Sequence, residues 1–196
     1  MFYDDRKMAG LLLYVGSAQF LIGLMAAAAV DPGYSIRSNF ISDLGVRAGA
    51  TIFNGSIIVL GLLILLAAYF LQRVTTKLWF TILVMVAGIG AMGVGVFNEN
   101  AGDVHGVFSL IAFVGAGLSA IATFRFTKPP FAYLSILFGL ISLVSLGLFL
   151  SGNYLGLGKG GMERMIVLPV LAWALAFGGY LIAPVEHAGE GGPTTG

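Results

Sequence analysis

The sequence predicts an all-α membrane protein in which six transmembrane helices form one bundle, and composition is the first reason. Of the 196 residues, 58% are hydrophobic and only 10% are charged, and the mean hydropathy is +0.97. No soluble domain needs this balance, so the expected solvent is lipid. A net charge of +1 without a basic stripe argues against a nucleic-acid partner. The lack of cysteine excludes disulfides and zinc–thiolate sites.

Six charge-free hydrophobic segments are the second reason. Each has roughly 20 residues, which lets a helix cross about 30 Å of hydrocarbon. A single open strand would leave backbone groups unpaired in lipid, so each segment is predicted to be a helix. The predicted spans are 8–30, 51–72, 78–97, 105–124, 131–151 and 165–183.

Glycine, proline and the two chain ends refine this prediction. Small residues such as Gly90 and Gly93 in the third span let transmembrane helices pack closely, and Pro169 predicts a kink in the sixth. The first span ends in "MAAAAV", like a signal-peptide cleavage site, but Asp4 and Asp5 do not fit a basic leader, so a true helix is predicted. Residues 1–183 form one predicted transmembrane domain, and 184–196 a disordered tail.

Lysine and arginine counts predict the orientation. The side that holds both termini has six, namely Arg6, Lys7, Arg73, Lys77, Arg125 and Lys128. The opposite side has four, namely Arg37, Arg47, Lys159 and Arg164. The positive-inside rule then predicts a multi-pass protein of the cell membrane with both termini in the cytoplasm.

Candidate functional residues gather in the three connections on the opposite side. In "SNFISDLG" (38–45), Ser38 is a candidate cap of a short helix, on which Asn39 and Asp43 would share one face. Asp43 either caps the helix or pairs with an arginine, or it points into a polar pocket. Three side chains of this segment are candidate site residues: Asn39, Ser42 and Asp43.

The other two connections add further candidates. In "NENAGDVHG" (98–106), Asp103 is a predicted N-cap, and His105 is suited to act as a base, a ligand or a hydrogen-bond donor. Asn98 and Asp103 are candidate ligands, but their spacing is not that of an EF-hand, and no metal is predicted. The glycine-rich 152–164 segment lacks the spacing of a Walker phosphate loop. Its backbone is still suited to bind an anion, and the Arg164 guanidinium could contact that anion with two N–H groups. The alternative is that this segment is a flexible turn.

Motifs in these connections resemble a known family. "YSIRSNFISDLG", "GVGVFNENAGDVHGVFSLIAF" and "GGMERMIVLPVLAW" are similar to the six-helix membrane family described as domain of unknown function 998. A fainter likeness extends to the damage-regulated autophagy modulator and Sfk-type group and to a GPI-lipid-remodelling factor, which implies a membrane-lipid theme. This chain has Phe97 and Asn98 where those relatives have an aromatic residue followed by glutamine.

These observations predict one polar pocket at the extracytoplasmic end of the bundle. Asp43, His105 and Glu163 are the candidate catalytic residues, and Arg164 is expected to contact a carboxylate and to bind an anion or a lipid head group. Membrane lipids are the predicted partners, a homo-oligomer is allowed, and no cofactor is predicted. Whether the protein is a lipid-modifying enzyme or a non-catalytic binding protein stays open. An ion-coupled transporter is disfavoured because every charge lies outside the predicted spans.

Overall fold

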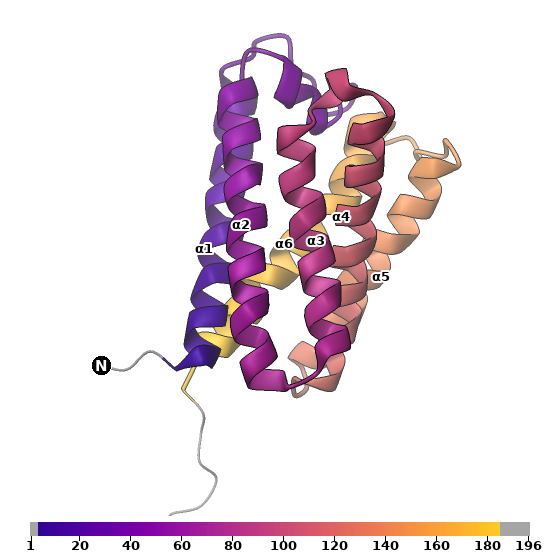
Figure 1. Ribbon diagram of the computed structural model, residues 1–196. Helices are drawn as coiled ribbons and strands as arrows, with labels where there is room; N and C mark the ends of the chain where they lie inside the picture. The colour runs from indigo at the N-terminus through magenta and orange to yellow at the C-terminus, as the bar shows by residue number, and fades with distance from the viewer. Residues whose placement is uncertain (1–3, 185–196) are drawn as a thin grey trace, which may run out of the picture.

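Six long helices pack in a single bundle in the computed structural model, which describes residues 4–184 (Figure 1). They are α1 (Asp5–Ala29), α2 (Ala50–Thr75), α3 (Leu78–Val96), α4 (Asp103–Ala122), α5 (Phe131–Leu150) and α6 (Gly158–Ile182). Three short 3-10 helices, η1 (Ser42–Val46), η2 (Glu99–Ala101) and η3 (Thr123–Arg125), lie between them. All six long helices have the length and apolar composition to cross a membrane, so the predicted fold class is confirmed. From residue 185 onward the predicted tail lies outside the described residues.

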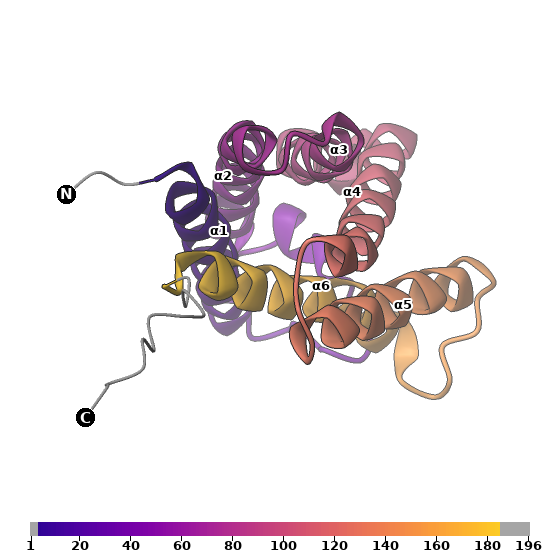
Figure 2. The same ribbon diagram turned by 90° about the horizontal axis from the view of Figure 1, so that it is seen from below.

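The helices form a ring with one helix outside it. Consecutive helices pack against each other, and α6 closes the ring by packing against α1 (Figure 2). Helix α5 lies outside the ring, against α4 and α6. The start of α1 and the end of α6 meet at one end of the bundle, where Arg6 donates to the Ala183 carbonyl at 2.7 Å. The α1–α2 loop (30–49), the α3–α4 connection (97–102) and the α5–α6 connection (151–157) lie at the other end, called the loop end here.

Glycines set the spacing between α3 and its neighbour α4, as predicted. A Cβ added to Gly90 would lie 2.4 Å from the backbone nitrogen of Ala112. A Cβ added to Gly93 would lie 2.1 Å from the ring of Phe108. No side chain fits at either distance, so the close approach of these two helices depends on glycine.

Aromatic side chains fill the bundle interior away from the loop end. Phe80 and Phe177 are 0% and 1% exposed, and Trp173 stacks on Phe177 with ring centroids 5.7 Å apart. This packing closes the interior on the side of the chain termini.

Helix α6 begins seven residues earlier than predicted, at Gly158 instead of residue 165. The prediction was wrong because the span was drawn from charge-free residues only, which left Glu163 and Arg164 in the connection before it. The α1–α2 loop folds against the first turns of α6 and supplies polar partners there. A Cβ at Gly160 would lie 2.0 Å from the Asn39 carbonyl oxygen, so the contact requires glycine. The helix continues through Pro169.

Candidate functional site

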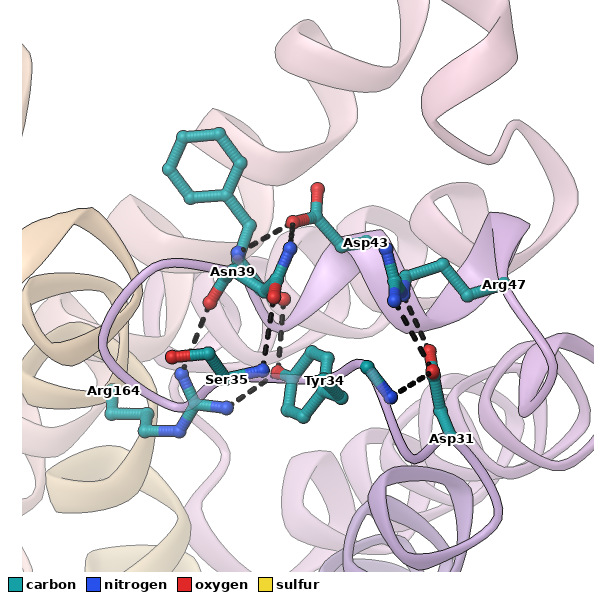
Figure 3. Close-up of polar contacts among 9 residues, drawn as sticks. Asp31, Tyr34, Ser35, Asn39, Asp43, Arg47 and Arg164 are labelled. Atoms are coloured by element: carbon teal, nitrogen blue, oxygen red, sulfur yellow. Dashed lines mark hydrogen bonds and ion pairs between the residues drawn. The ribbon is translucent and has the colours of Figure 1, made fainter.

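An ion pair closes the α1–α2 loop on itself. Arg47 donates to both carboxylate oxygens of Asp31, with Nη2 at 3.1 Å from Oδ1, and the Gly33 amide donates to the same oxygen (Figure 3). The hydrogen bond from Arg47 lowers the pKa of Asp31 below its ordinary value, although burial opposes this shift. This pair fixes the start and the end of the loop.

Asn39 and Asp43 organise the centre of the loop. Asn39 accepts from the Ser35 amide at 2.9 Å and donates to Asp43 Oδ2 at 2.9 Å (Figure 3). Asp43 Oδ2 also accepts from the Phe40 amide at 2.9 Å, in the manner of the acid in a capping box. The predicted helix start was wrong, because the short helix is η1, which begins at Ser42 and is not capped by Ser38.

Arg164 holds the loop through neutral groups, and the predicted contact with a carboxylate was wrong. Its guanidinium donates to the Ile36 carbonyl at 3.0 Å and to the Gly160 carbonyl at 2.8 Å. It also donates to the Asn39 carbonyl and to the Tyr34 hydroxyl (Figure 3). Among the described residues, the ion pairs join other arginines, Arg47 and Arg73, to their acids. Two carbonyls and one hydroxyl of the α1–α2 loop converge on the Arg164 fork, which no spacing rule in the sequence predicts.

Glu163 fastens the same loop from inside the bundle. It is 6% exposed, and Oε2 accepts a hydrogen bond from the Ile41 amide. Two neighbouring residues of α6 thus bind the loop backbone. Arg164 donates hydrogen bonds to loop carbonyls, and Glu163 accepts one from a loop amide. Glu163 also lines the cavity described next.

A cavity of about 250 Å³ lies at the loop end, between the α1–α2 loop and helices α4, α5 and α6. We call it the loop-end cavity. Its polar lining residues are Ser42, Glu99, His105, Ser109 and Glu163. Its apolar lining comes mostly from α4 and α5: Phe40, Leu110, Phe113, Leu146, Phe149 and Leu150. No lysine or arginine is among the lining residues.

His105 is oriented inside this cavity by the backbone. Its Nδ1 lies 2.8 Å from the Phe97 carbonyl oxygen, which only accepts, so Nδ1 carries a hydrogen, and in the neutral ring Nε2 is the acceptor. Ser109 Oγ lies 3.3 Å from Nε2 and therefore donates to it. Ser109 was not among the predicted site residues, although its position four residues after His105 places both on one helix face.

Glu99 joins Asp43 and Ser42 at the edge of the cavity. Ser42 Oγ donates to Glu99 Oε1 at 2.7 Å. Burial raises the pKa of Glu99, and the neighbouring Asp43 raises it further. Burial also raises the pKa of Asp43. The hydrogen bonds from Asn39, Glu99 and Phe40 lower it by more, so the pKa of Asp43 is below its ordinary value. Of these two neighbouring carboxyl groups, Glu99 is therefore the weaker acid and Asp43 the stronger.

Comparison with known proteins identifies the family. The family described as "Protein of unknown function (DUF998)" matches residues 14–180. The chain belongs to the DUF998 family. No curated protein and no solved structure matches it. The DUF998 match includes the α1–α2 loop and every residue that lines the loop-end cavity.

Two candidate ligands of this DUF998 protein lie apart from the cavity lining. Asn98 accepts from the Asn100 amide at 3.2 Å and starts η2. Asp103 is the first residue of α4 and is exposed, while Gly102, with φ +56°, occupies the N-cap, so the predicted Asp103 cap was wrong. Of the predicted site residues, Ser42, His105 and Glu163 line one cavity, whereas Asn39, Asp43 and Arg164 stabilise the loop that covers it.

Proposed function

We propose that this protein binds a membrane lipid, with the polar end of the lipid in the loop-end cavity and its hydrocarbon between α4 and α5. The observation that carries the proposal is the division of the cavity lining. Hydroxyl, carboxyl and imidazole groups lie beside apolar side chains from two membrane-spanning helices. A lipid has the same division, and pockets of this kind fix a ligand through a few polar groups within an apolar lining.

The lining favours a head group that donates hydrogen bonds. Glu99 and Glu163 bring two carboxyl groups, and the lining contains no cation. The hydroxyl oxygen of Ser109, whose hydrogen points to His105 Nε2, adds an acceptor. A hydroxyl or an ammonium group suits these partners, whereas a phosphate alone would meet acids. Arg164, the cation expected to bind an anion, is already engaged by the α1–α2 loop.

The orientation belongs to the same proposal. With six lysines and arginines on the side of the termini and four on the loop side, we place the termini in the cytoplasm of a cell-membrane protein. The loop-end cavity then opens toward the outer leaflet and takes its lipid from there.

A cavity-filling substitution with a matched control tests the proposal. Gly106 on α4 lines the cavity, and a Cβ there meets no atom within 4 Å, so Gly106→Phe introduces a ring at the cavity without a clash at Cβ. Gly147 on α5 is equally open but does not line the cavity, so Gly147→Phe is the control. Native mass spectrometry of the purified proteins is expected to show bound lipid in the parent and in Gly147→Phe, and its loss in Gly106→Phe. Equal lipid in all three would refute the proposal.

The contact between Ser109 and His105 favours a second candidate function, lipid-ester hydrolysis or transfer. Ser109 Oγ would attack the ester carbonyl while His105 Nε2 takes its proton and passes it to the leaving alcohol; water or a second alcohol then releases the acyl group. Labelling by a fluorophosphonate that disappears in Ser109→Ala, with turnover of a lipid ester, would support this reaction. Lipid binding without labelling or turnover would leave binding as the function.

A further inference from the structure

Glu163 brings a free acceptor atom to the loop-end cavity. The side chain lines this cavity and is 6% exposed. Its Oε2 accepts from the Ile41 amide, whereas Oε1 accepts no hydrogen bond within the described part of the chain. Oε1 is also not one of the fully enclosed polar atoms there. A ligand in the cavity can therefore contact one oxygen of a carboxyl group that is otherwise buried.

The nearest cations do not pair with this carboxyl group. Arg164, the next residue, donates to loop carbonyls and to the Tyr34 hydroxyl (Figure 3). Lys159 Nζ lies 4.1 Å from the centre of the Phe40 ring. Within the described residues, neither cation forms an ion pair with a carboxylate. A buried carboxylate without a paired cation is costly, so a positive charge on the ligand would be stabilised beside Glu163.

A second pair of carboxyl groups lies at the edge of the cavity. Burial and the neighbouring Asp43 raise the pKa of Glu99, and together they outweigh Ser42 and Lys159, which lower it. A further negative charge is therefore unfavourable at Glu99 in the empty cavity. A cationic ligand would make that charge favourable.

The apolar part of the lining also suits a cation. Three aromatic rings line the cavity, those of Phe40, Phe113 and Phe149. The face of an aromatic ring attracts a positive charge, and Phe40 already attracts the ammonium of Lys159.

The free polar atoms of the lining are acceptors. Besides Glu163 Oε1 and the Glu99 carboxyl group, the lining has Ser109 Oγ, whose own hydrogen points to His105 Nε2. A primary ammonium has three N–H donors, whereas a hydroxyl has one. A primary ammonium therefore uses these acceptors more fully than an alcohol does.

We propose that the head group bound in the loop-end cavity is a primary ammonium, that Glu163 is its charge partner, and that the ligand is an aminolipid. This inference rests on the proposed function, which allows a hydroxyl or an ammonium, and narrows it to the cation. The hydrocarbon stays between α4 and α5. A water-soluble amine has the same head chemistry, and the experiment below distinguishes the two sources.

Photo-crosslinking with competition tests the charge. The full-length protein in nanodiscs is irradiated with dodecylamine that carries a diazirine near its amine, and mass spectrometry maps the adducts. Adducts are expected on lining residues such as Leu110 and Phe149. Dodecylamine should displace this probe at a roughly ten- to hundredfold lower concentration than dodecanol, because hydrogen bonds to charged groups are the stronger ones. Equal competition by amine and alcohol would keep the proposed function and overturn the ammonium.

A charge-removing variant tests the role of Glu163. Glu163→Gln keeps an oxygen for the Ile41 amide and removes the negative charge, so the advantage of dodecylamine over dodecanol should vanish. Asp103→Asn should keep the advantage, because this exposed acid at the start of α4 does not line the cavity. An unchanged advantage in Glu163→Gln would overturn the assignment of the charge partner. The comparison of amine with alcohol in the parent protein decides on the ammonium even if Glu163→Gln does not fold.

Three further probes separate the remaining possibilities. Dodecyltrimethylammonium has the charge without N–H groups, and competition equal to that of dodecylamine would overturn the primary amine. Butylamine should compete poorly, and competition equal to that of dodecylamine would assign the cavity to a soluble amine and overturn the lipid. A dodecanol probe with the diazirine near its hydroxyl completes the set. Absence of cavity adducts from both the amine and the alcohol probe would overturn this inference and the proposed function together.

Discussion

Replacing Arg164 with alanine removes the side chain that joins the start of α6 to the α1–α2 loop. The guanidinium donates to three carbonyls and to the Tyr34 hydroxyl, and no carboxylate pairs with it. Arg164→Ala therefore leaves neutral acceptors without a donor, but it leaves no buried carboxylate without its cation. Because the loop covers the loop-end cavity, the loss of these hydrogen bonds should also make this wall of the cavity less rigid.

The expected cost follows from these contacts. A hydrogen bond to a charged group contributes about 1.5–3 kcal/mol, and bonds from one side chain are not additive. Water can reach the Ile36 carbonyl, whose bond is exposed, so part of the loss is recovered. We expect Arg164→Ala to lower the free energy of unfolding by about 2–4 kcal/mol, less than the roughly 3–5 kcal/mol of a broken buried ion pair. For a chain of this size that corresponds to roughly 4–16 °C in melting temperature.

Thermal unfolding of the detergent-purified protein measures this change. Arg164→Lys should recover only part of the stability, since an ammonium cannot reach both the Tyr34 hydroxyl and the carbonyls. The double variant with Tyr34→Phe should cost less than the sum of the single variants, because the two side chains share a bond. Arg125→Ala, at an exposed arginine near the other end, is the control. An unchanged melting temperature in Arg164→Ala, or full recovery by lysine, would refute the reasoning.

Three further predictions concern packing, orientation and charge. Gly93→Leu should sharply reduce the folded yield, because a Cβ there lies 2.1 Å from an aromatic ring of α4, while Gly147→Leu should not; equal yields would contradict the packing argument. In whole cells, an impermeant thiol reagent should label Ala48→Cys and not Thr76→Cys, and the reverse pattern would invert the orientation. Because burial raises the pKa of Glu99, the folded state loses stability as the pH rises above the ordinary value of 4.5. Glu99→Gln should flatten this loss in melting curves recorded across pH, and an unchanged profile would argue against a proton held on Glu99.

The sequence by itself determined the fold class, the number of spans and the end of the bundle where polar residues gather. Lipid accepts only segments that satisfy their own backbone hydrogen bonds, so long charge-free runs have to be helices. The role of Gly93 was predictable for a similar reason, since close helix packing requires small residues. The start of α6 was not predictable, because Glu163 and Arg164 obtain their partners from a loop more than a hundred residues earlier in the chain.

Only the tertiary structure decided which polar residues face a cavity and which stabilise a loop. His105 and Glu163 line the loop-end cavity, but Arg164 turns to backbone carbonyls. Glu99 joins the cavity through a hydrogen bond to Ser42 across 57 positions of sequence. The physical reason is that side chains at the end of a bundle bind whichever groups the packing of the helices brings within reach. Charge and spacing along the chain do not specify those distances.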